Sequence, residues 1–213
     1  MKYDLTRPPT RSATRALTAF SNAFFNLLTE KSFEEISVNE ICDAAGYPRA
    51  TFYNYFNDKY DLLNYLWYRV SSKIQIEDYK NLERISVLPV FFSRFYDLLE
   101  SLEDNLTKIL THNSGDGYFL GSLHIYFNTQ IKTIVEGSGL ADRLTIPRDL
   151  ASAHYANTLY LIFEWRFIKH NFCSKEKAYD YLIALFKGTP PDGVDPPLNL
   201  AYSPHKTNDA PLS

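Results

Sequence analysis

A short stretch near the N-terminus gathers side chains that can hydrogen-bond the edges of nucleic-acid bases. Arg49, Thr51 and Asn54 lie close together in the sequence. Arginine can bond the edge of a guanine, threonine can contact the methyl group of a thymine, and asparagine can pair with an adenine. Tyr53 adds a hydroxyl group that can bond a phosphate. The chemistry that this spacing indicates is recognition of DNA.

A short helix is predicted to precede these residues and to begin after Ser37. Glu40 stands at the third helical position, so the two side chains can form a capping box, and Ile36 and Ile41 can form a hydrophobic staple around the cap. Gly46 can adopt the left-handed conformation that ends a helix. The sequence therefore encodes both ends of this helix.

A second helix is predicted to begin at about Pro48, since proline suits the first turn of a helix. Phe52 and Phe56 are four residues apart and should face a core. Two helices joined by a short turn containing glycine are typical of the helix-turn-helix motif, whose second helix enters the major groove. Asp58 is predicted to cap the next helix, with the Lys59 ammonium in its first turn facing a phosphate.

The segment from about Thr14 to Leu63, which includes AGYPRATFYNYFNDKYDLL, resembles the TetR-type (TetR/AcrR) transcriptional regulators of bacteria. The resemblance implies an all-α fold: an N-terminal three-helix helix-turn-helix DNA-binding head, joined by a connector helix to a C-terminal helical ligand-binding and dimerisation domain. It also implies a homodimer on a pseudo-palindromic operator in double-stranded DNA. Ala50 and Tyr47 replace the commoner glycine and valine of the family, and because of Tyr47 and Arg49 the operator sequence does not follow from relatives. The predicted DNA-binding residues are Ser37, Tyr47, Pro48, Arg49, Thr51, Tyr53, Asn54 and Lys59.

Composition bounds the remaining possibilities. The net charge of −3 argues against a protein that coats nucleic acid without selectivity, although four basic residues oppose one acidic residue in the first fifteen. Residues 1–10 are predicted to be a flexible basic arm, which either follows DNA or is a solvated tail without a role. Aromatic residues make up 15% of the chain, which suits a ligand cavity or a subunit interface as well as an ordinary core.

Several classes of function find no support in the sequence. Cys42 and Cys173 form no disulfide or metal pattern, and the histidines lack metal-ligand spacing. There is no glycine-rich phosphate loop and no recognisable nucleophile frame, so we expect neither an enzyme nor a cofactor. No run approaches the roughly eighteen apolar residues of a membrane span, and the first residues, MKYDLTRPPT, contain no apolar signal core. We therefore expect a soluble cytoplasmic protein without a membrane partner.

The rest of the chain is predicted to be helical up to Lys187. We divide it into a helix-turn-helix domain at 11–57, an effector-binding and dimerisation domain at 58–187, and a Pro-rich tail at 188–213. The tail is expected to be extended or disordered, with packing on a partner subunit as the alternative. Expected helices after the connector begin near Pro89, 106, 118, Pro147 and Lys175, and the one from Pro147 should continue to about Lys169.

A dimer and a ligand pocket are expected in the second domain. The helix at about 148–169 is apolar on more than one face and, with Tyr179, Leu182, Ile183 and Phe186, could form a four-helix contact between two subunits. A largely apolar, flat ligand is expected, because aromatics are abundant and basic residues few. The candidate polar residues of the pocket are His124, Tyr126, Asn128, Gln130, His154 and Asn157, which cannot all point the same way.

The function that these observations favour is a dimeric DNA-binding transcriptional regulator, most simply a repressor released from its operator by a small, largely apolar effector. The alternative is a regulator that acts mainly through a protein partner, as a co-activator does. A closed apolar cavity among the central helices would favour the effector, whereas a polar exposed surface without a cavity would favour the protein partner.

Overall fold

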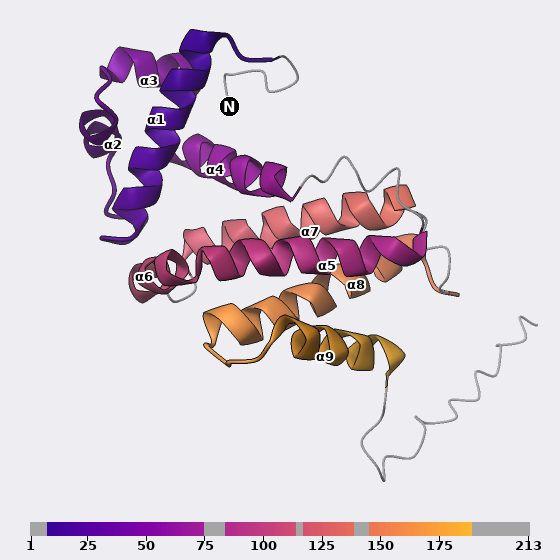
Figure 1. Cartoon of the computed structure of the whole chain (residues 1–213). Coiled ribbons are helices and arrows are strands. Elements are labelled where there is room, and N and C mark those ends of the chain that lie inside the picture. Colours follow the sequence, from indigo (N-terminus) through magenta and orange to yellow (C-terminus); the bar gives the residue numbers. More distant parts are fainter. Residues whose placement is uncertain (1–7, 75–83, 114–116, 139–144, 189–213) are drawn as a thin grey trace, which may run out of the picture.

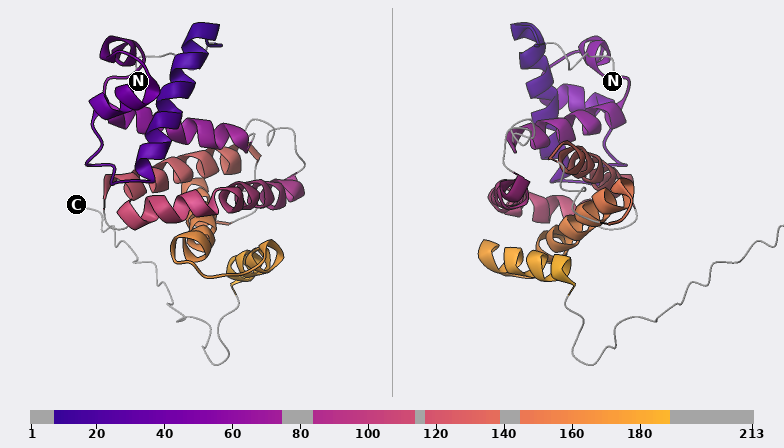
Figure 2. Two further views of the ribbon diagram at one scale, coloured as in Figure 1. Left: turned by 60° about the vertical axis from the view of Figure 1, so that its left-hand side comes forward. Right: turned by 90° about the vertical axis from the view of Figure 1, so that its right-hand side faces the viewer.

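The chain folds into an all-α structure, described here by a computed structural model. The structure describes residues 8–74, 84–113, 117–138 and 145–188, with side chains from Val87 onward in the second range, and these residues contain no strand. The basic arm as far as residue 7 and the tail beyond Gly188 lie outside the described residues. Helices α1 to α4 form one group, and α5 to α9 form a second group beneath it (Figure 1). The other views agree and place α9 farthest from α3 (Figure 2).

The helix bounds follow the expected order of elements. They are α1 (Arg11–Leu28), α2 (Val38–Ala45), α3 (Arg49–Tyr55), α4 (Lys59–Lys73), α5 (Arg84–Ser101), α6 (Glu103–Asn113), α7 (Tyr118–Ser138), α8 (Arg148–Phe163), the π-helix η3 (Glu164–Ile168) and α9 (Lys175–Lys187).

The capping signals that the sequence predicted are present. Ser37 Oγ accepts from the Glu40 amide, and the Glu40 carboxylate accepts from the Ser37 amide, which confirms the capping box. Gly46 has φ 70° and ψ 30°, the left-handed conformation that ends α2. Asp58 caps α4 by accepting from the Asp61 amide at 2.9 Å. These local bonds satisfy amides that helix ends leave free.

The predicted start of α3 is off by one residue. Pro48 is the residue before the helix, with φ −62° and ψ 149°, and the first helical residue is Arg49. The proline ring fixes φ but leaves ψ open, so the same residue serves either position.

Two hydrophobic clusters organise the interior. We define the head cluster as the buried residues packed around Phe20, Phe24, Phe52 and Phe56, each fully buried; most of its members belong to the segment from α1 to α4. The rings of Phe20 and Phe52 meet edge-on, with centroids 5.3 Å apart. The C-terminal cluster joins α5, α7, α8 and α9, where α7 packs along α8.

The head cluster does not end with the first four helices. It also contains Ile109 from α6 and Phe119 from α7. Leu62 and Leu66 of α4 lie in it as well, so it continues past residue 57, where the predicted first domain ends. The helices that carry α3 are therefore packed directly against the second group of helices.

Two expectations about the second group need correction, and a third holds in length but not in the type of helix. Helix α5 begins at Arg84, so Pro89, which the sequence placed near its start, lies inside the helix. A proline after the first turn of a helix removes one backbone hydrogen bond. The short helix expected at 106–112 is longer, because it begins at Glu103. The helix expected to continue to Lys169 becomes a π-helix after Phe163. Side-chain periodicity did not distinguish these local changes.

Candidate nucleic-acid interface and cavity

Helix α3 presents one face to solvent and buries the other. Arg49 and Asn54 are exposed, and Thr51 and Tyr53 are partly exposed. Phe52 on the opposite face is fully buried in the head cluster. The structure therefore leaves the predicted base-reading groups accessible on a helix that the core holds in place.

The Arg49 side chain lies along α3 toward Tyr53. Its Nη2 donates to the Tyr53 hydroxyl at 3.2 Å, and its guanidinium lies 5.7 Å from the centroid of the Tyr53 ring. The hydrogen bond to Tyr53 raises the pKa of Arg49 above its ordinary value. A guanidinium oriented in this way still directs its remaining N–H groups to solvent, where a base edge could accept them.

Tyr47 and Pro48 form the turn before α3. The Tyr47 ring packs on Phe20, with centroids 5.4 Å apart, and is only partly exposed. Pro48 is exposed. Tyr47 therefore contributes to the head cluster, and any contact of this residue with DNA stays a prediction.

Ser37 is occupied by its own helix cap. Its hydroxyl donates to Glu40 Oε2 at 2.8 Å, and the Glu40 carboxylate also pairs with Lys31. The bonds from Lys31 and Ser37 lower the pKa of Glu40 to about 2. A carboxylate therefore stands beside the hydroxyl of this predicted DNA-binding residue, and its contact with DNA stays a prediction.

The ammonium group of Lys59 binds the head's own backbone. Its Nζ donates to the carbonyl oxygens of Phe33, Glu34 and Ile36 at 2.8, 2.8 and 2.9 Å. Burial lowers the pKa of Lys59, and the nearby Glu34 carboxylate partly opposes this shift. An ammonium has three N–H donors, so these bonds account for all of them. The predicted phosphate contact would require at least one of these bonds to be exchanged.

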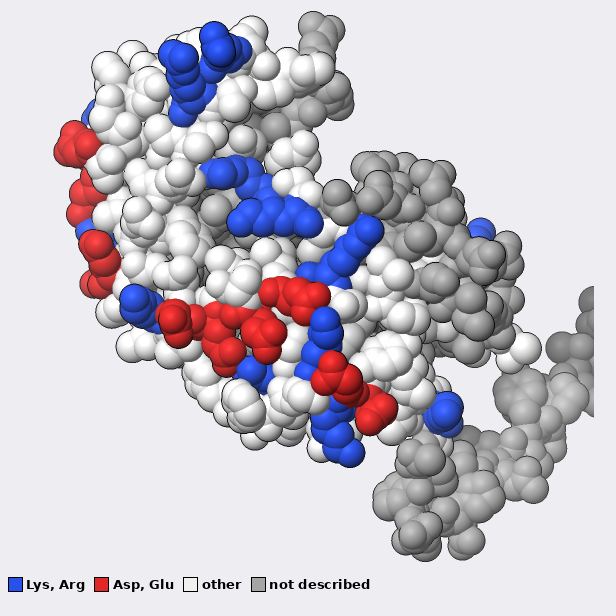
Figure 3. Space-filling view, in the orientation of Figure 1, with Lys and Arg blue, Asp and Glu red and all other residues white. Residues whose placement is uncertain are grey.

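Charged side chains are unevenly distributed over the face shown in Figure 3. Basic groups lie at the top, over the start of α1, while acidic groups follow the left-hand edge. Arg11 and Arg15 of α1 are exposed. The basic end of α1 lies at the same end of the molecule as α3 (Figure 1), which suits a phosphate backbone passing over both.

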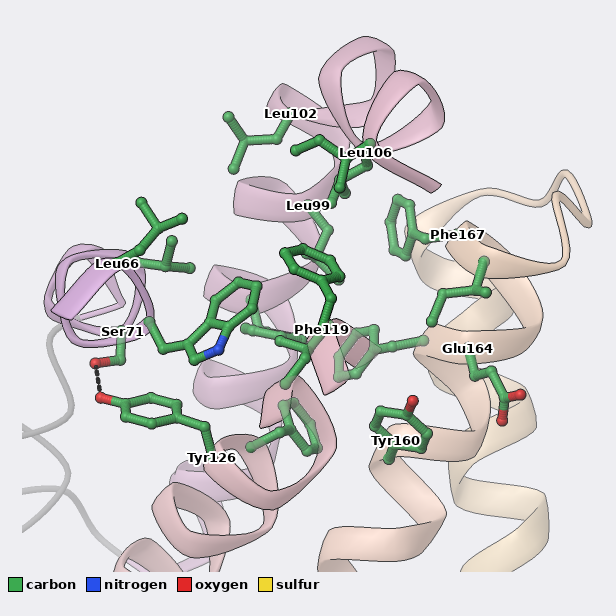
Figure 4. A pocket seen from close by; sticks show the side chains of 18 of the residues that line it. Leu66, Ser71, Leu99, Leu102, Leu106, Phe119, Tyr126, Tyr160, Glu164 and Phe167 are labelled. Carbon is green, nitrogen blue, oxygen red and sulfur yellow. Dashed lines mark hydrogen bonds between the residues drawn. The ribbon is translucent and has the colours of Figure 1, made fainter. Parts of the chain in front are cut away.

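A cavity of about 110 Å³ lies where the two groups of helices meet. Its walls come from the end of α1, from α4, α5, α6 and α7, and from the α8–η3 junction. Ser71 and Tyr126 lie on one side of it, and Tyr160 and Glu164 lie on the other (Figure 4). The described residues that line it include no Lys, Arg or His. The cavity is therefore suited to apolar molecules.

Two polar residues of the cavity wall, Ser71 and Tyr126, pair with each other, whereas Glu164 pairs with a residue outside the wall. Ser71 Oγ and Tyr126 Oη are 2.8 Å apart, and burial raises the pKa of Tyr126. Glu164 pairs with Lys169 at 3.3 Å. Burial and the nearby Glu164 carboxylate raise the pKa of Tyr160, so its hydroxyl keeps its proton.

The structure brings only some of the predicted pocket residues to this cavity. Tyr126 and Gln130 line it, whereas His124, Asn128, His154 and Asn157 do not. His124 stacks on Tyr160 with ring centroids 4.2 Å apart, and its buried Nε2 lacks a hydrogen-bond partner among the described atoms. His154 and Asn157 lie on the exposed side of α8.

Sequence reasoning missed most of the cavity wall. Phe25 and Leu28 of α1 line it, and neither was predicted as a pocket residue. Trp67 of α4 also lines it, and its indole N–H donates to Ser122 of α7 at 3.1 Å. Helical periodicity identifies an apolar face but does not show that two such faces leave a space between them.

The outer face of α8 and α9 is apolar and exposed. Leu161 and Leu185 are 48% and 45% exposed, and the rings of Trp165 and Tyr181 meet edge-on at 5.7 Å. The α9 residues expected at a subunit contact mostly face inward instead: Leu182 is fully buried, and Tyr179 packs on Phe92. The other edge of α9 is therefore the one available to a partner.

The described residues offer neither a membrane-spanning helix nor a metal site. No helix among them is long and apolar enough to cross a bilayer. They also contain no group of three or more His, Cys, Asp or Glu side chains that could hold a metal ion.

Comparison with known proteins agrees with the geometry of the head. Residues 22–66 match the sequence model of the family described as bacterial regulatory proteins, tetR family. This match runs from the middle of α1 to the middle of α4 and includes all of α2 and α3. A search of curated proteins gave no match.

Solved structures with the same fold include three regulators. A structure described as a TetR-family transcriptional regulator from Syntrophomonas wolfei has a TM-score of 0.61 at 17% identity, covering 83% of this chain and 95% of its own. A Clostridium perfringens protein described as a fatty acid metabolism regulator has a TM-score of 0.55 at 17% identity, and the match covers 81% of this chain and 99% of that one. The dihydroxyacetone kinase operon activator DhaS has a TM-score of 0.53 at 18% identity, and the match covers 81% of this chain and 94% of that one. At these identities the likeness concerns the fold.

Proposed function

We propose, from the premise that this chain is a TetR-family transcriptional regulator, that it binds a pseudo-palindromic operator in double-stranded DNA as a homodimer. The observation that carries this proposal is the two-sided helix α3. Its Phe52 is buried in the head cluster, while Arg49 and Asn54 are exposed on the other side. A recognition helix needs this combination of a fixed backbone and accessible polar groups.

Base reading is assigned to the exposed positions of α3. Arg49 bonds a guanine, Asn54 pairs with an adenine, and Thr51 contacts a thymine methyl group. Tyr53 positions the Arg49 guanidinium through the 3.2 Å bond and offers its ring face to it. Arg11 and Arg15 at the start of α1 supply contacts to the phosphate backbone.

A second copy of the chain is the partner that we assign to the outer face of α8 and α9. This face exposes Leu161, Tyr181 and Leu185 and carries the half-buried Trp165, and a two-fold contact would bury all four on both subunits at once. It lies far from α3 (Figure 2), so two heads remain free to meet DNA. Two-fold symmetry would place the recognition helices on half-sites roughly 34–36 Å apart.

A small apolar effector is assigned to the cavity. The cavity wall contains no basic residue in the described part of the chain, so a carboxylate or phosphate group on the ligand would be buried without a partner. An apolar cavity of about 150 Å³ lined by Leu, Ile and Phe binds benzene, and this one is about 110 Å³. The effector is therefore uncharged where it is buried, and it releases a repressor by changing the separation of the heads.

The alternative is a regulator that acts mainly through a protein partner. An exposed polar surface on central helices without a cavity would have favoured it. The observed cavity between α4, α6 and α7 supports the effector instead.

The experiment that tests the function begins with selection of duplexes from a random library by the wild-type protein. The selected duplex is then titrated with wild-type protein, Arg49→Ala and Arg148→Ala at two salt concentrations. Arg148 is also exposed but stands at the start of α8, so it is a matched control. Arg49→Ala should lose about 1–3 kcal/mol of discrimination at one base pair, and Arg148→Ala should behave as wild type.

Two outcomes would contradict the proposal. One is a library from which no sequence is enriched. The other is an enriched sequence that Arg49→Ala still binds with unchanged preference at every base pair. Analytical ultracentrifugation of Leu185→Glu, which places a charge on the outer face of α9, tests the homodimer separately, with exposed Lys187→Glu as its control.

A further inference from the structure

The cavity touches the DNA-binding head directly. Phe25 and Leu28, at the end of α1, line one part of its wall, and Ile109 and Leu110 of α6 line another. Ile109 is 2% exposed and belongs to the head cluster, although α6 is part of the second group of helices. A molecule that enters the cavity therefore contacts α1 and α6 at the place where they meet.

Asn113, the last residue of α6, links this wall to the loop before α2. Its Oδ1 accepts from the Phe33 amide at 2.8 Å, and its Nδ2 donates to the Ile109 carbonyl at 2.9 Å. The side chain is 8% exposed. One end of the amide is therefore bound within α6 and the other end is bound across the junction. A buried amide is costly to leave unpaired, so this orientation is well fixed.

The loop that accepts this link leads straight into the helix-turn-helix. Phe33 is fully buried and lies four residues before Ser37, which caps α2. The Lys59 ammonium binds the Phe33 carbonyl and thereby ties the same residue to the start of α4. A displacement of the Phe33 backbone would therefore reach both helices that border α3.

The other end of α6 is held in the C-terminal group. The Arg166 guanidinium donates to both carboxylate oxygens of Glu103, the first residue of α6, at 2.8 and 3.1 Å. Arg166 is 2% exposed, and it also donates to the Tyr96 hydroxyl at 3.2 Å. Helix α6 is thus fixed to η3 at its start and to the head loop at its end, with Leu106, Ile109 and Leu110 facing the cavity between them.

We propose that Asn113 is the positioning residue through which occupation of the cavity displaces the head. A ligand that moves the Ile109 segment pivots α6 about its anchored start and carries Asn113 with it. The bond to the Phe33 amide then shifts the loop before α2. This inference rests on the proposed function, because it concerns the regulation of the same DNA-binding surface.

A cavity-filling substitution serves as the probe, since it needs no known effector. Leu106→Phe places a larger side chain in the cavity on α6 itself. It is combined with Asn113→Leu, which removes both hydrogen bonds of the Asn113 side chain. The two substitutions form a double-mutant cycle, in which the measured quantity is the affinity for the selected duplex. Asn128→Leu is the matched control, because Asn128 Nδ2 also donates to the carbonyl four residues earlier but lies on α7 without the bond to Phe33.

Leu106→Phe should weaken binding to the selected duplex by about tenfold in the wild-type background and in the Asn128→Leu control background, both of which keep Asn113. In the Asn113→Leu background the same substitution should change affinity by less than about twofold. Asn113→Asp keeps an acceptor for the Phe33 amide, so in that background Leu106→Phe should again weaken DNA binding. Equal effects of Leu106→Phe in both backgrounds, which a merely structural role of Asn113 produces, would overturn the proposal. An unchanged affinity in the wild-type background would do the same.

Amide hydrogen exchange of the loop at residues 29–37 gives a readout that does not involve DNA. Leu106→Phe should accelerate exchange at Phe33 in the wild-type background and add nothing once Asn113→Leu is present. If no duplex is selected but exchange follows this pattern, the proposed function fails and the coupling stands. If DNA binds selectively but exchange at Phe33 ignores Leu106→Phe, the coupling fails and the function stands.

Discussion

The head and the cavity region are built from the same kinds of residue, but the head is densely packed and the cavity region is not. In the head, aromatic rings such as Phe20, Phe52 and Phe56 meet edge-on and are fully buried. Around the cavity, equally large side chains such as Phe95 and Phe127 leave about 110 Å³ unfilled. Dense packing fixes the surface to which we assign DNA binding, whereas loose packing leaves the space to which we assign an effector.

Removal of the Lys59 ammonium should cause the largest loss of stability in the densely packed head. Lys59→Met keeps the apolar stem but leaves the carbonyls of Phe33, Glu34 and Ile36 without their donor. Loss of a hydrogen-bonded charged group costs about 1.5–3 kcal/mol, measured as the free energy of unfolding in urea. Exposed Lys73→Met at the end of α4 is the control and should change little.

The same variant distinguishes a structural role of Lys59 from a phosphate contact. If Lys59 acts only within the head, the salt dependence of DNA binding should match that of wild type for the folded variant. A slope that falls by about one unit would instead assign Lys59 to a phosphate.

A matched pair of enlarging substitutions compares the packing of the two regions. Leu62→Phe, at a fully buried position of the head, should destabilise by about 1–3 kcal/mol through overpacking. Leu106→Phe beside the cavity should cost less than about 1 kcal/mol, since the added atoms enter existing space. Thermal denaturation of both variants measures the difference. Equal destabilisation would mean that the cavity collapses around its natural side chains.

Small probes sharpen the chemistry of the cavity. Benzene at ten times its dissociation constant should stabilise the protein by about 1.4 kcal/mol. Hexanoate should not bind, because the described wall contains no cation to pair with its carboxylate. Differential scanning fluorimetry with each probe, repeated on Leu106→Phe, tests whether binding occurs in this cavity. Stabilisation by hexanoate that Leu106→Phe abolishes would contradict the assignment.

The pH dependence of the α2 cap is the smallest expected effect. The Glu40 pKa falls from 4.5 to about 2 in the folded protein because Lys31 and Ser37 bond the carboxylate. A lowered folded pKa contributes stability that is fully present above about pH 4.5 and is lost as the pH falls toward 2. The difference in unfolding free energy between wild type and Glu40→Gln should therefore shrink over this range. A constant difference would show that the cap does not depend on the charge.

The sequence predicted the head more fully than the cavity because the signals differ in range. The caps at Ser37 and Asp58 and the helix end at Gly46 depend on residues within one turn, and all three are confirmed. The cavity depends on how α1, α4, α6 and α7 cross, which no local signal encodes. His154 and Asn157 were predicted as pocket residues for their polarity, but the turn of α8 points them to solvent.

The π-helix and Asn113 escaped prediction for a related reason. The extra residue in each turn of η3 lets Arg166 turn inward to Glu103, a partner sixty-three positions away. Asn113 reads as the start of a polar loop, NSGDG, and its role arises only from the approach of Phe33. Both depend on contacts between distant segments.

The wall that α1 contributes to the cavity also limits how this protein can evolve. Phe25 and Leu28 line the cavity, while Leu28 is fully buried in the head cluster. A substitution there that adapts the cavity to a new ligand also alters the stability of the head, so selection acts on two traits at once. Drift in ligand preference should therefore accumulate on the walls from α5 and α8, away from the head. Across natural relatives, the lineage-specific differences would be concentrated at Leu99, Tyr160 and Phe163.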